Sequence, residues 1–266
     1  GAVKEESTYR GVVNSFHSAF TAWKVLLADP NPQIKNLVKL NGMFWFTVSG
    51  TQMTLLPLLM VAPRSAEMLA TAEGASSSLG LAMSAGEIGG CFAFMSLVSF
   101  LCAQPMAYFA DKYGKVPAIL TGCGLLSASM FAIPLTTSDA AVMQLSIPLF
   151  SALPDYAPIL LAVLTPFALG NTALNATPTA LMSDLSDATS RAQALSLLRT
   201  SGDLGLLLGA SFAGALAHYS SLDTALVTNG ALTAAAMIWF TSKQYSPFFS
   251  RRLSKHNSPT ENTNLR

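Results

Sequence analysis

Long uncharged stretches recur along the chain and separate its charged residues into short groups. Five ranges contain no Asp, Glu, Lys or Arg: 40–63, 88–110, 116–138, 156–183 and 224–242. A sixth range, 192–217, contains only Arg199 and Asp203 among these residue types. A helix that crosses a lipid bilayer needs about 20 residues without uncompensated charge. The pattern therefore predicts an all-α, polytopic membrane protein with six transmembrane helices.

Composition agrees with this prediction and excludes other classes. Hydrophobic residues make up 51% of the chain and charged residues 11%, whereas an ordinary soluble domain is about 25% charged. A soluble bundle with long buried helices is the alternative, and the even spacing of the six ranges disfavours it. The formal net charge of +1 provides no positive excess for nucleic acid. We therefore expect the lipid bilayer as a partner and no nucleic acid.

The cysteines give no sign of a metal site or a disulfide scaffold. Cys91, Cys102 and Cys123 all lie in the uncharged ranges. They have neither CxxC spacing nor partners at the spacing of zinc ligands. We expect no metal, no cofactor and no disulfide framework.

The basic residues predict the orientation of the chain in the membrane. Of the 15 Lys and Arg residues, all but Arg64 and Arg199 lie before the first span, between the second and third, between the fourth and fifth, or after the sixth. Cytoplasmic loops carry the excess of Lys and Arg. Both termini are therefore expected in the cytoplasm.

Three regions follow from these patterns. Residues 1–39 are expected to form a cytoplasmic linker, in which 11–28 has the spacing of an amphipathic helix on the membrane surface, or else is a flexible segment. Residues 40–242 are expected to form the six-helix membrane domain. Residues 243–266 are polar and charged, which predicts a disordered cytoplasmic tail.

A short loop of distinctive composition connects the second and third spans. Its residues are Asp111, Lys112, Gly114 and Lys115. The loop is so short that the two helices must be antiparallel. Gly114 permits the left-handed backbone of a tight turn, the two lysines favour the cytoplasm, and Asp111 can accept hydrogen bonds from a nearby helix N-terminus.

This loop resembles the signature loop of the major facilitator superfamily, G-x-x-x-D-R/K-x-G-R/K, with Pro105 roughly where a glycine is usual. The resemblance spans about residues 30–243. It implies a secondary transporter that works by alternating access, with two inverted three-helix repeats and with the Asp111 to Lys115 loop as a conformational switch. Its substrate would be a small solute, with proton coupling left open. Direction and substrate identity are not specified.

Two features resemble the C-terminal half of such a twelve-helix carrier. The first half usually has an Arg four residues before a glycine in its fourth helix, and here Pro166 stands four residues before Gly170. In addition, a basic segment precedes the first span and a polar tail follows the sixth. The partner would be an N-terminal six-helix half of the same transporter or a second chain.

Arg199 and Asp203 are the ionisable residues inside a predicted span. Charged side chains within a membrane are costly and usually have a structural or functional role. Their spacing of four residues allows an ion pair along one helix face. The alternative is that Asp203 exchanges a proton, or meets a cationic substrate, during transport.

Amides in the first and fourth spans are candidates for the substrate cavity. Asn171 and Asn175 lie one helical turn apart between Pro166 and Pro178, and Gln52 is a side-chain amide within the first span. In the superfamily that the chain resembles, the corresponding helices line the central cavity. The alternative for each is a hydrogen bond between helices.

Small residues in the fifth span have two interpretations. Gly205, Gly209 and Gly214 resemble a degenerate form of the superfamily's antiporter motif, in which Ala210 replaces a proline and Ala213 a glycine. Glycines at this spacing also let two membrane helices approach closely, and we favour that helix-packing role.

Other functions fit the sequence less well than transport. Gly209-Ala210-Ser211 matches the G-x-S string of an intramembrane protease, but the nearest histidine, His218, is on the same predicted helix, so a Ser–His pair cannot form. The chain has no G-x-x-x-x-G-K-S/T loop for ATP. We predict that the protein is not an enzyme. A non-transporting receptor or scaffold on the same fold stays open.

Overall fold

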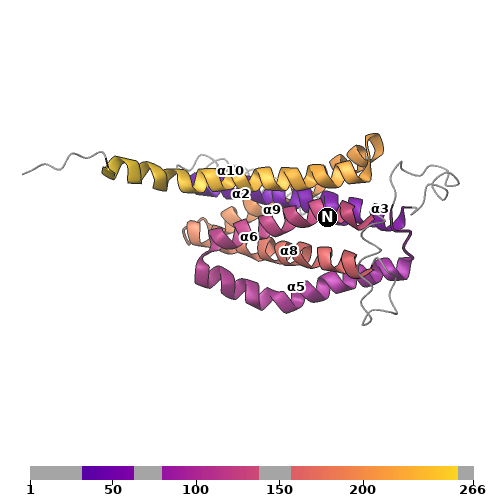
Figure 1. The fold of residues 1–266 in the computed structure, drawn as a ribbon. Coiled ribbons are helices and arrows are strands. Elements are labelled where there is room, and N and C mark those ends of the chain that lie inside the picture. The colour runs from indigo at the N-terminus through magenta and orange to yellow at the C-terminus, as the bar shows by residue number, and fades with distance from the viewer. Residues whose placement is uncertain (1–31, 63–79, 138–156, 257–266) are drawn as a thin grey trace, which may run out of the picture.

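The chain forms a bundle of long helices. The computed structural model describes residues 32–62, 80–137 and 157–256, and this part contains helices and no strands. The first span combines α2 (Pro32–Val48), the π-helix η1 (Ser49–Leu55) and α3 (Leu56–Val61). The others are α5 (Ala85–Tyr113), α6 (Lys115–Ala132) with the 3-10 turn η2 (Ile133–Thr137), α8 (Ala157–Leu185), α9 (Arg191–Tyr219) and α10 (Leu222–His256). Figure 1 shows these helices lying side by side.

The described helices confirm the six predicted spans. Six helices are long and apolar enough to cross a membrane: Pro32–Val61, Ala85–Tyr113, Lys115–Thr136, Ile159–Leu185, Arg191–Tyr219 and Leu222–Gln244. Each contains most or all of one uncharged or nearly uncharged range of the sequence. The all-α membrane fold predicted from charge spacing is therefore correct.

The first and last helices extend beyond the uncharged ranges of the sequence, whereas the last membrane span ends at Gln244. The first helix begins at Pro32, inside the range expected to be a linker, and proline suits the first turn of a helix. Helix α10 continues to His256, past the point where the sequence predicted disorder. A helix end depends on backbone hydrogen bonds, so a change to polar composition does not by itself end it. The surface helix predicted at 11–28 lies outside the described residues.

The helix contacts follow the symmetry of two inverted three-helix repeats. Helix α2 packs on α9, and α5 packs on α8. In two such repeats, α2, α5 and α6 correspond in order to α8, α9 and α10. The α2–α9 pair therefore corresponds to the α8–α5 pair. By the same correspondence, the α6–α8 contact matches the α10–α2 contact, and the α6–α10 contact matches itself.

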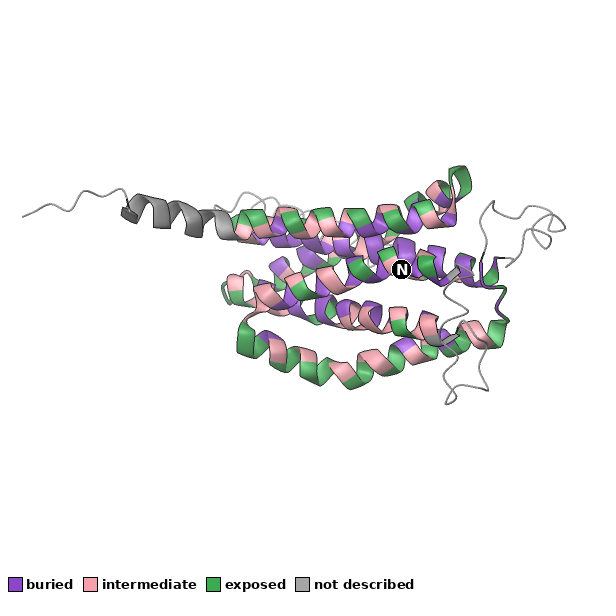
Figure 2. Cartoon of the chain, viewed as in Figure 1, coloured by how far each residue is buried: buried purple, intermediate pink, exposed green. Residues whose placement is uncertain are grey.

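The core lies between the inner helices, and α5 contributes little to it. The largest fully buried side chains include Leu37, Leu126, Phe167 and Phe240. Only Cys91, Met95 and Ala110 are buried among the residues of α5, and its outer surface is mostly exposed in Figure 2. Exposed apolar side chains are expected where a helix faces lipid, since lipid tails solvate them.

The start of α5 is fixed by its own side chains. Ser84 is the N-cap, and Glu87 accepts a hydrogen bond from the Ser84 backbone nitrogen at 2.7 Å. The Glu87 backbone nitrogen donates in turn to Ser84 Oγ. This capping box satisfies donors that the first turn of a helix leaves open, and it gives Glu87 a structural role at the end of its span.

Candidate functional site

The three amides singled out in the sequence lie on one cavity. Gln52 from η1 and Asn171 and Asn175 from α8 line a cavity of about 430 Å³, together with residues of α5. Asn171 Nδ2 donates to Gln52 Oε1 at 3.4 Å, which joins the first and fourth spans. Asn175 is exposed on the same helix, one turn further along.

Three other polar residues of this cavity were not predicted from the sequence. Ser96 and Ser99 of α5 and Thr172 of α8 also line it. Serine and threonine in membrane helices commonly bond to their own backbone, as Ser96 does to Phe92 O at 2.9 Å and Thr172 to Ala168 O at 2.8 Å. Their type alone therefore gives little signal. The spacing of the two serines, three residues apart on one helix face, was the available clue.

A π-helix places Gln52 in the cavity wall. In this segment each turn contains an extra residue, which shifts the side chains that follow around the helix axis. Neighbouring helices hold the segment from two further sides. Ser49 donates its hydroxyl to Leu206 O of α9 at 2.7 Å, and Asn229 Nδ2 of α10 donates to Thr51 Oγ1 at 3.2 Å. Such segments recur at functional sites.

Two buried amide oxygens have no partner among the described residues. They are Asn171 Oδ1, at the cavity, and Asn229 Oδ1, behind η1. Buried polar atoms are nearly always hydrogen-bonded, so each exception calls for a water, a ligand or a strained state. Each of these two oxygens keeps an unused acceptor within the helix bundle. Pro166 and Pro178 lie inside the same helix, where each removes a backbone hydrogen bond.

The loop between α5 and α6 makes a tight turn through one glycine. Gly114 has φ +100° and ψ 152°, so the positive φ predicted for this turn is present. Residues with a side chain rarely adopt this conformation. Lys112 lies over the rings of Tyr108 and Tyr113, with its Nζ 5.7 and 5.4 Å from their centroids.

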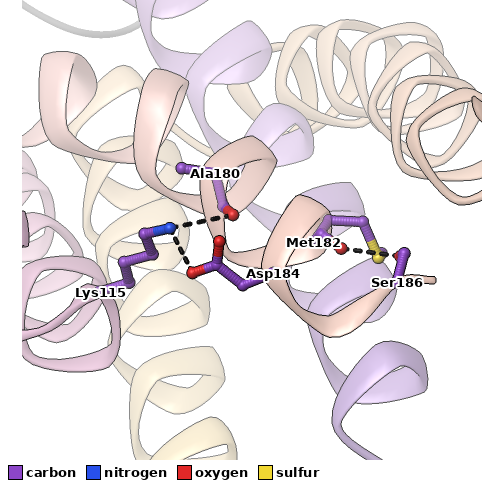
Figure 3. Close-up of polar contacts among 5 residues, drawn as sticks. All are labelled: Lys115, Ala180, Met182, Asp184 and Ser186. Atoms are coloured by element: carbon purple, nitrogen blue, oxygen red, sulfur yellow. Dashed lines mark hydrogen bonds and ion pairs between the residues drawn. The ribbon is translucent and has the colours of Figure 1, made fainter. Parts of the chain in front are cut away.

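Lys115 joins the start of α6 to the end of α8 (Figure 3). Its ammonium group donates to Ala180 O at 3.2 Å and forms an ion pair with Asp184. A cation at a helix C-terminus is favourable because the last carbonyls carry partial negative charge. Ser186, one turn after Met182, closes the same helix end by donating to Met182 O at 2.7 Å. Asp184 was not among the predicted residues.

Asp111 lies on the surface near the end of α5, four residues before Lys115. Its side chain is exposed, and within the described ranges it has no hydrogen bond or ion pair. The hydrogen bond from a helix N-terminus that the sequence suggested is therefore absent from the described contacts.

Arg199 and Asp203 form an ion pair along α9. Arg199 Nε lies 3.5 Å from Asp203 Oδ1, and the two side chains are 83% and 57% exposed. Gly202, which directly precedes Asp203, lies on the opposite, inner side of α9 against Trp45 of α2. The pair is thus on the outer face of α9, within the span Arg191–Tyr219.

The glycines of α9 differ in what they contact. A Cβ atom at Gly205 would overlap Gly42 O, and one at Gly209 would overlap Phe46 O, both on α2. At Gly214 the nearest atom, Thr54 Cγ2, would be at an ordinary 3.7 Å. Gly205 and Gly209 thus allow backbone-to-backbone contact between α2 and α9, the packing that small residues provide in membranes.

The described residues offer no arrangement for protease or metal chemistry. Ser211 donates its hydroxyl to Leu207 O at 3.1 Å, and His218 packs on Tyr219. Among the described residues, no group of three or more His, Cys, Asp or Glu could hold a metal ion. Cys91, Cys102 and Cys123 are free thiols.

The six spans make the chain an integral, multi-pass membrane protein with a polar cavity in its helix bundle. It belongs to the Major Facilitator Superfamily, whose family model matches residues 40–263. This family consists of membrane transporters, which move small molecules, so the resemblance of the signature loop identified the family correctly. Comparison with curated proteins and with solved structures finds no match.

Proposed function

We propose that the chain is the C-terminal six-helix half of a secondary active carrier that moves a small solute by alternating access. Six spans provide one wall of a central cavity. A second six-helix unit, from the same polypeptide or another chain, would provide the opposite wall. Both termini would lie in the cytoplasm, as the distribution of Lys and Arg predicts.

The grouping of amides in one cavity carries this proposal. Gln52, Asn171 and Asn175 converge from two spans, and two serines and a threonine extend the same surface. Ligand sites commonly combine apolar walls with a few convergent polar groups. An amide both donates and accepts hydrogen bonds, so this wall suits a solute that carries hydroxyl, carbonyl or amide groups.

Uptake measurements on cavity variants test the proposal. A panel of polar solutes is offered to cells that express the chain together with the second six-helix unit, and uptake is followed by mass spectrometry. Asn171→Ala should lower uptake of a transported solute about tenfold, because a solute group loses its hydrogen-bond partner in a confined site. Gln104→Ala is the matched control, since Gln104 is exposed on α5 outside the cavity. Solute binding by the unaltered protein with no flux would contradict a carrier and favour a receptor.

The ion pair on α9 supports a further element of the proposal. An exposed charge in the middle of a span is not tolerated against lipid, so this face suits water or protein. We assign Asp203 a role in coupling: it exchanges a proton, or meets a cationic group, as the cavity alternates. Arg199, one turn away, pairs with the Asp203 carboxylate when the carboxylate binds neither a proton nor a cationic group.

Asp203→Asn tests this role without a change in side-chain size. Gradient-driven transport should be lost while the protein still inserts at normal levels. Energy-independent exchange of solute across the membrane should persist, because binding and alternation are retained. Unchanged gradient-driven transport would remove Asp203 from the mechanism.

The α5–α6 loop is the element we assign to switching. Lys115 ties α6 to the end of α8, while Asp111 faces outward without a partner among the described residues. Asp111 is thus free to contact the second six-helix unit when the cytoplasmic side is closed. Asp111→Asn should slow solute exchange while leaving solute affinity unchanged.

A further inference from the structure

A second groove lies between α2 and α10, with different residues from those of the solute cavity. It has a volume of about 340 Å³ and is lined by Lys39, Leu40 and Met43 of α2 and by Leu232, Ala236 and Trp239 of α10, among others. On α10 the lining residues are three and four apart, so one face of that helix borders the groove. Apart from the Lys39 ammonium group, this lining is almost entirely apolar.

The groove lies at the ends of two uncharged ranges, which places it at one boundary of the membrane. The uncharged range 40–63 begins directly after Lys39, and the uncharged range 224–242 ends directly before Lys243. Both residues therefore mark the same membrane surface on adjacent helices. Trp239 lies one turn inside that surface, and tryptophan is enriched at such interfaces. The apolar part of the groove extends from there into the hydrocarbon region.

Positive charge gathers at this boundary of the membrane. Lys39 Nζ lies 5.8 Å from the centre of the Trp239 ring. Lys35 is one turn before Lys39, and Lys243 is one turn after Trp239, so both lie on the groove side of their helices. None of the three lysines forms an ion pair with another described residue. The described parts of α2 and of 224–244 in α10 contain no acidic residue.

We propose that this groove binds one anionic phospholipid. An acyl chain would lie along Leu40, Met43 and Leu232, and the head-group phosphate would lie at Lys39 between Lys35 and Lys243. Lysine binds phosphate as a point charge, and basic pockets between membrane helices suit anionic lipid head groups. The apolar length of the groove distinguishes a lipid from a free phosphate, which would occupy only the charged end.

This site depends on the membrane placement of α2 and α10 and is independent of the proposed transport function. It does, however, lie between α2 and α10, and Asn229 of α10 donates a hydrogen bond to Thr51, the neighbour of Gln52 in η1. A bound lipid would stabilise the α2–α10 contact at the groove.

Competition between two lipids tests the proposal on the full chain. The protein is purified in detergent, equal amounts of phosphatidylglycerol and phosphatidylcholine with the same acyl chains are added, and retained lipid is measured by native mass spectrometry. One phosphatidylglycerol should be retained in preference to phosphatidylcholine. Lys39→Gln should lower its retention about fivefold, as expected for one lysine at a membrane surface.

Arg191→Gln is the matched charge control. Arg191 lies at the start of α9, in the connection from α8 that the distribution of Lys and Arg places on the same membrane side, and it does not line the groove. This variant should retain phosphatidylglycerol normally. Equal retention of the two lipids, or equal losses in Lys39→Gln and Arg191→Gln, would overturn the proposal and indicate contact with bulk lipid only.

A second variant pair tests the acyl-chain part of the site. Ala236→Phe fills the groove without a change in charge and should reduce retention of phosphatidylglycerol at least fivefold. Ala231→Phe adds the same ring to an exposed position outside the groove and should have no effect. Glycerol phosphate and inorganic phosphate should not displace the bound lipid at millimolar concentration. Displacement by either would overturn the lipid assignment in favour of a free phosphate site.

Discussion

The contacts α2–α9 and α5–α8 occupy equivalent places in the two repeats, yet they are packed in opposite ways. Gly202, Gly205 and Gly209 of α9 lie directly against α2. By contrast, a Cβ atom at Gly86, Gly89 or Gly90 of α5 would meet nothing within 4 Å. In Figure 2 the α5 ribbon is largely exposed, whereas buried residues concentrate around α2 and the inner helices. The α2–α9 pair is thus packed backbone to backbone, whereas α5 and α8 border the solute cavity.

This difference explains where the cavity forms. At the α2–α9 contact, the α2 backbone is fixed by α9, and η1 is held by hydrogen bonds from Ser49 and Asn229. At the α5–α8 contact, α5 contributes few buried residues, and the space between it and α8 becomes the cavity beside Gln52 and Asn171. The cavity thus lies between η1, which hydrogen bonds from neighbouring helices hold in place, and α5, which is packed more loosely.

The largest effect is expected where the α2–α9 contact is tightest. Gly205→Leu places a side chain on the α2 backbone at Gly42 and should lower the free energy of unfolding by about 3 kcal/mol or more. The measurement is unfolding in detergent micelles. Gly90→Leu on α5 is the control, with an expected change of about 0.5 kcal/mol or less because its surroundings are open. Similar losses in both variants would remove the distinction between the two pairs.

The next effect concerns the turn that attaches α5 to the rest of the bundle. Gly114→Ala should lower the free energy of unfolding by about 2 kcal/mol, because φ +100° is strained for any residue with a side chain. Gly124→Ala, inside α6, is the control. Its added methyl group would meet only Met237 Sδ, at 3.9 Å, and alanine favours the helix. A stable Gly114→Ala protein would show that the turn can adopt another backbone conformation.

A smaller effect is expected from the polar contact behind η1. Asn229→Leu removes the hydrogen bond to Thr51 and should lower the free energy of unfolding by about 1 kcal/mol. Ser96→Ala, on α5, should have almost no effect because Ser96 bonds only to its own helix at Phe92 O. Solute affinity should fall in both variants, in the first through displacement of Gln52. An equal shift of the unfolding temperature in the two variants would contradict this difference between the polar contacts at η1 and at α5.

The smallest effect is expected at the ion pair between α6 and α8. The Lys115 and Asp184 side chains are 23% and 59% exposed. Exposed pairs of this kind contribute about 0.5 kcal/mol, and salt screens them. Lys115→Gln should therefore destabilise the protein slightly at low salt and by less at high salt. The double variant with Asp184→Asn should be no less stable than the single one, and an additive loss would show that the two residues act separately.

The sequence predicted the fold well because the cost of charge in lipid acts on every span. Each uncharged range became a membrane helix, including 192–217 with its Arg199–Asp203 pair. The helix ends were predicted less well. Pro32 and His256 lie outside the uncharged ranges, where lipid no longer constrains composition.

The cavity was predictable only in part. The amides of Gln52, Asn171 and Asn175 stood out because side-chain amides are uncommon in apolar spans, and all three line one cavity. Their role in solute binding stays a prediction. The π-helix that orients Gln52 left no sequence signal, since an extra residue in a turn depends on contacts with α9 and α10.

Access to Asn175 from the two sides of the membrane tests the central claim most directly. Asn175→Cys is made after Cys91, Cys102 and Cys123 have been replaced by alanine, and an impermeant thiol reagent is applied to each side of the membrane in turn. The account predicts labelling from both sides, reduced by a transported solute, because an alternating cavity opens to each side. Labelling from one side only, or none from either, would contradict alternating access at this cavity.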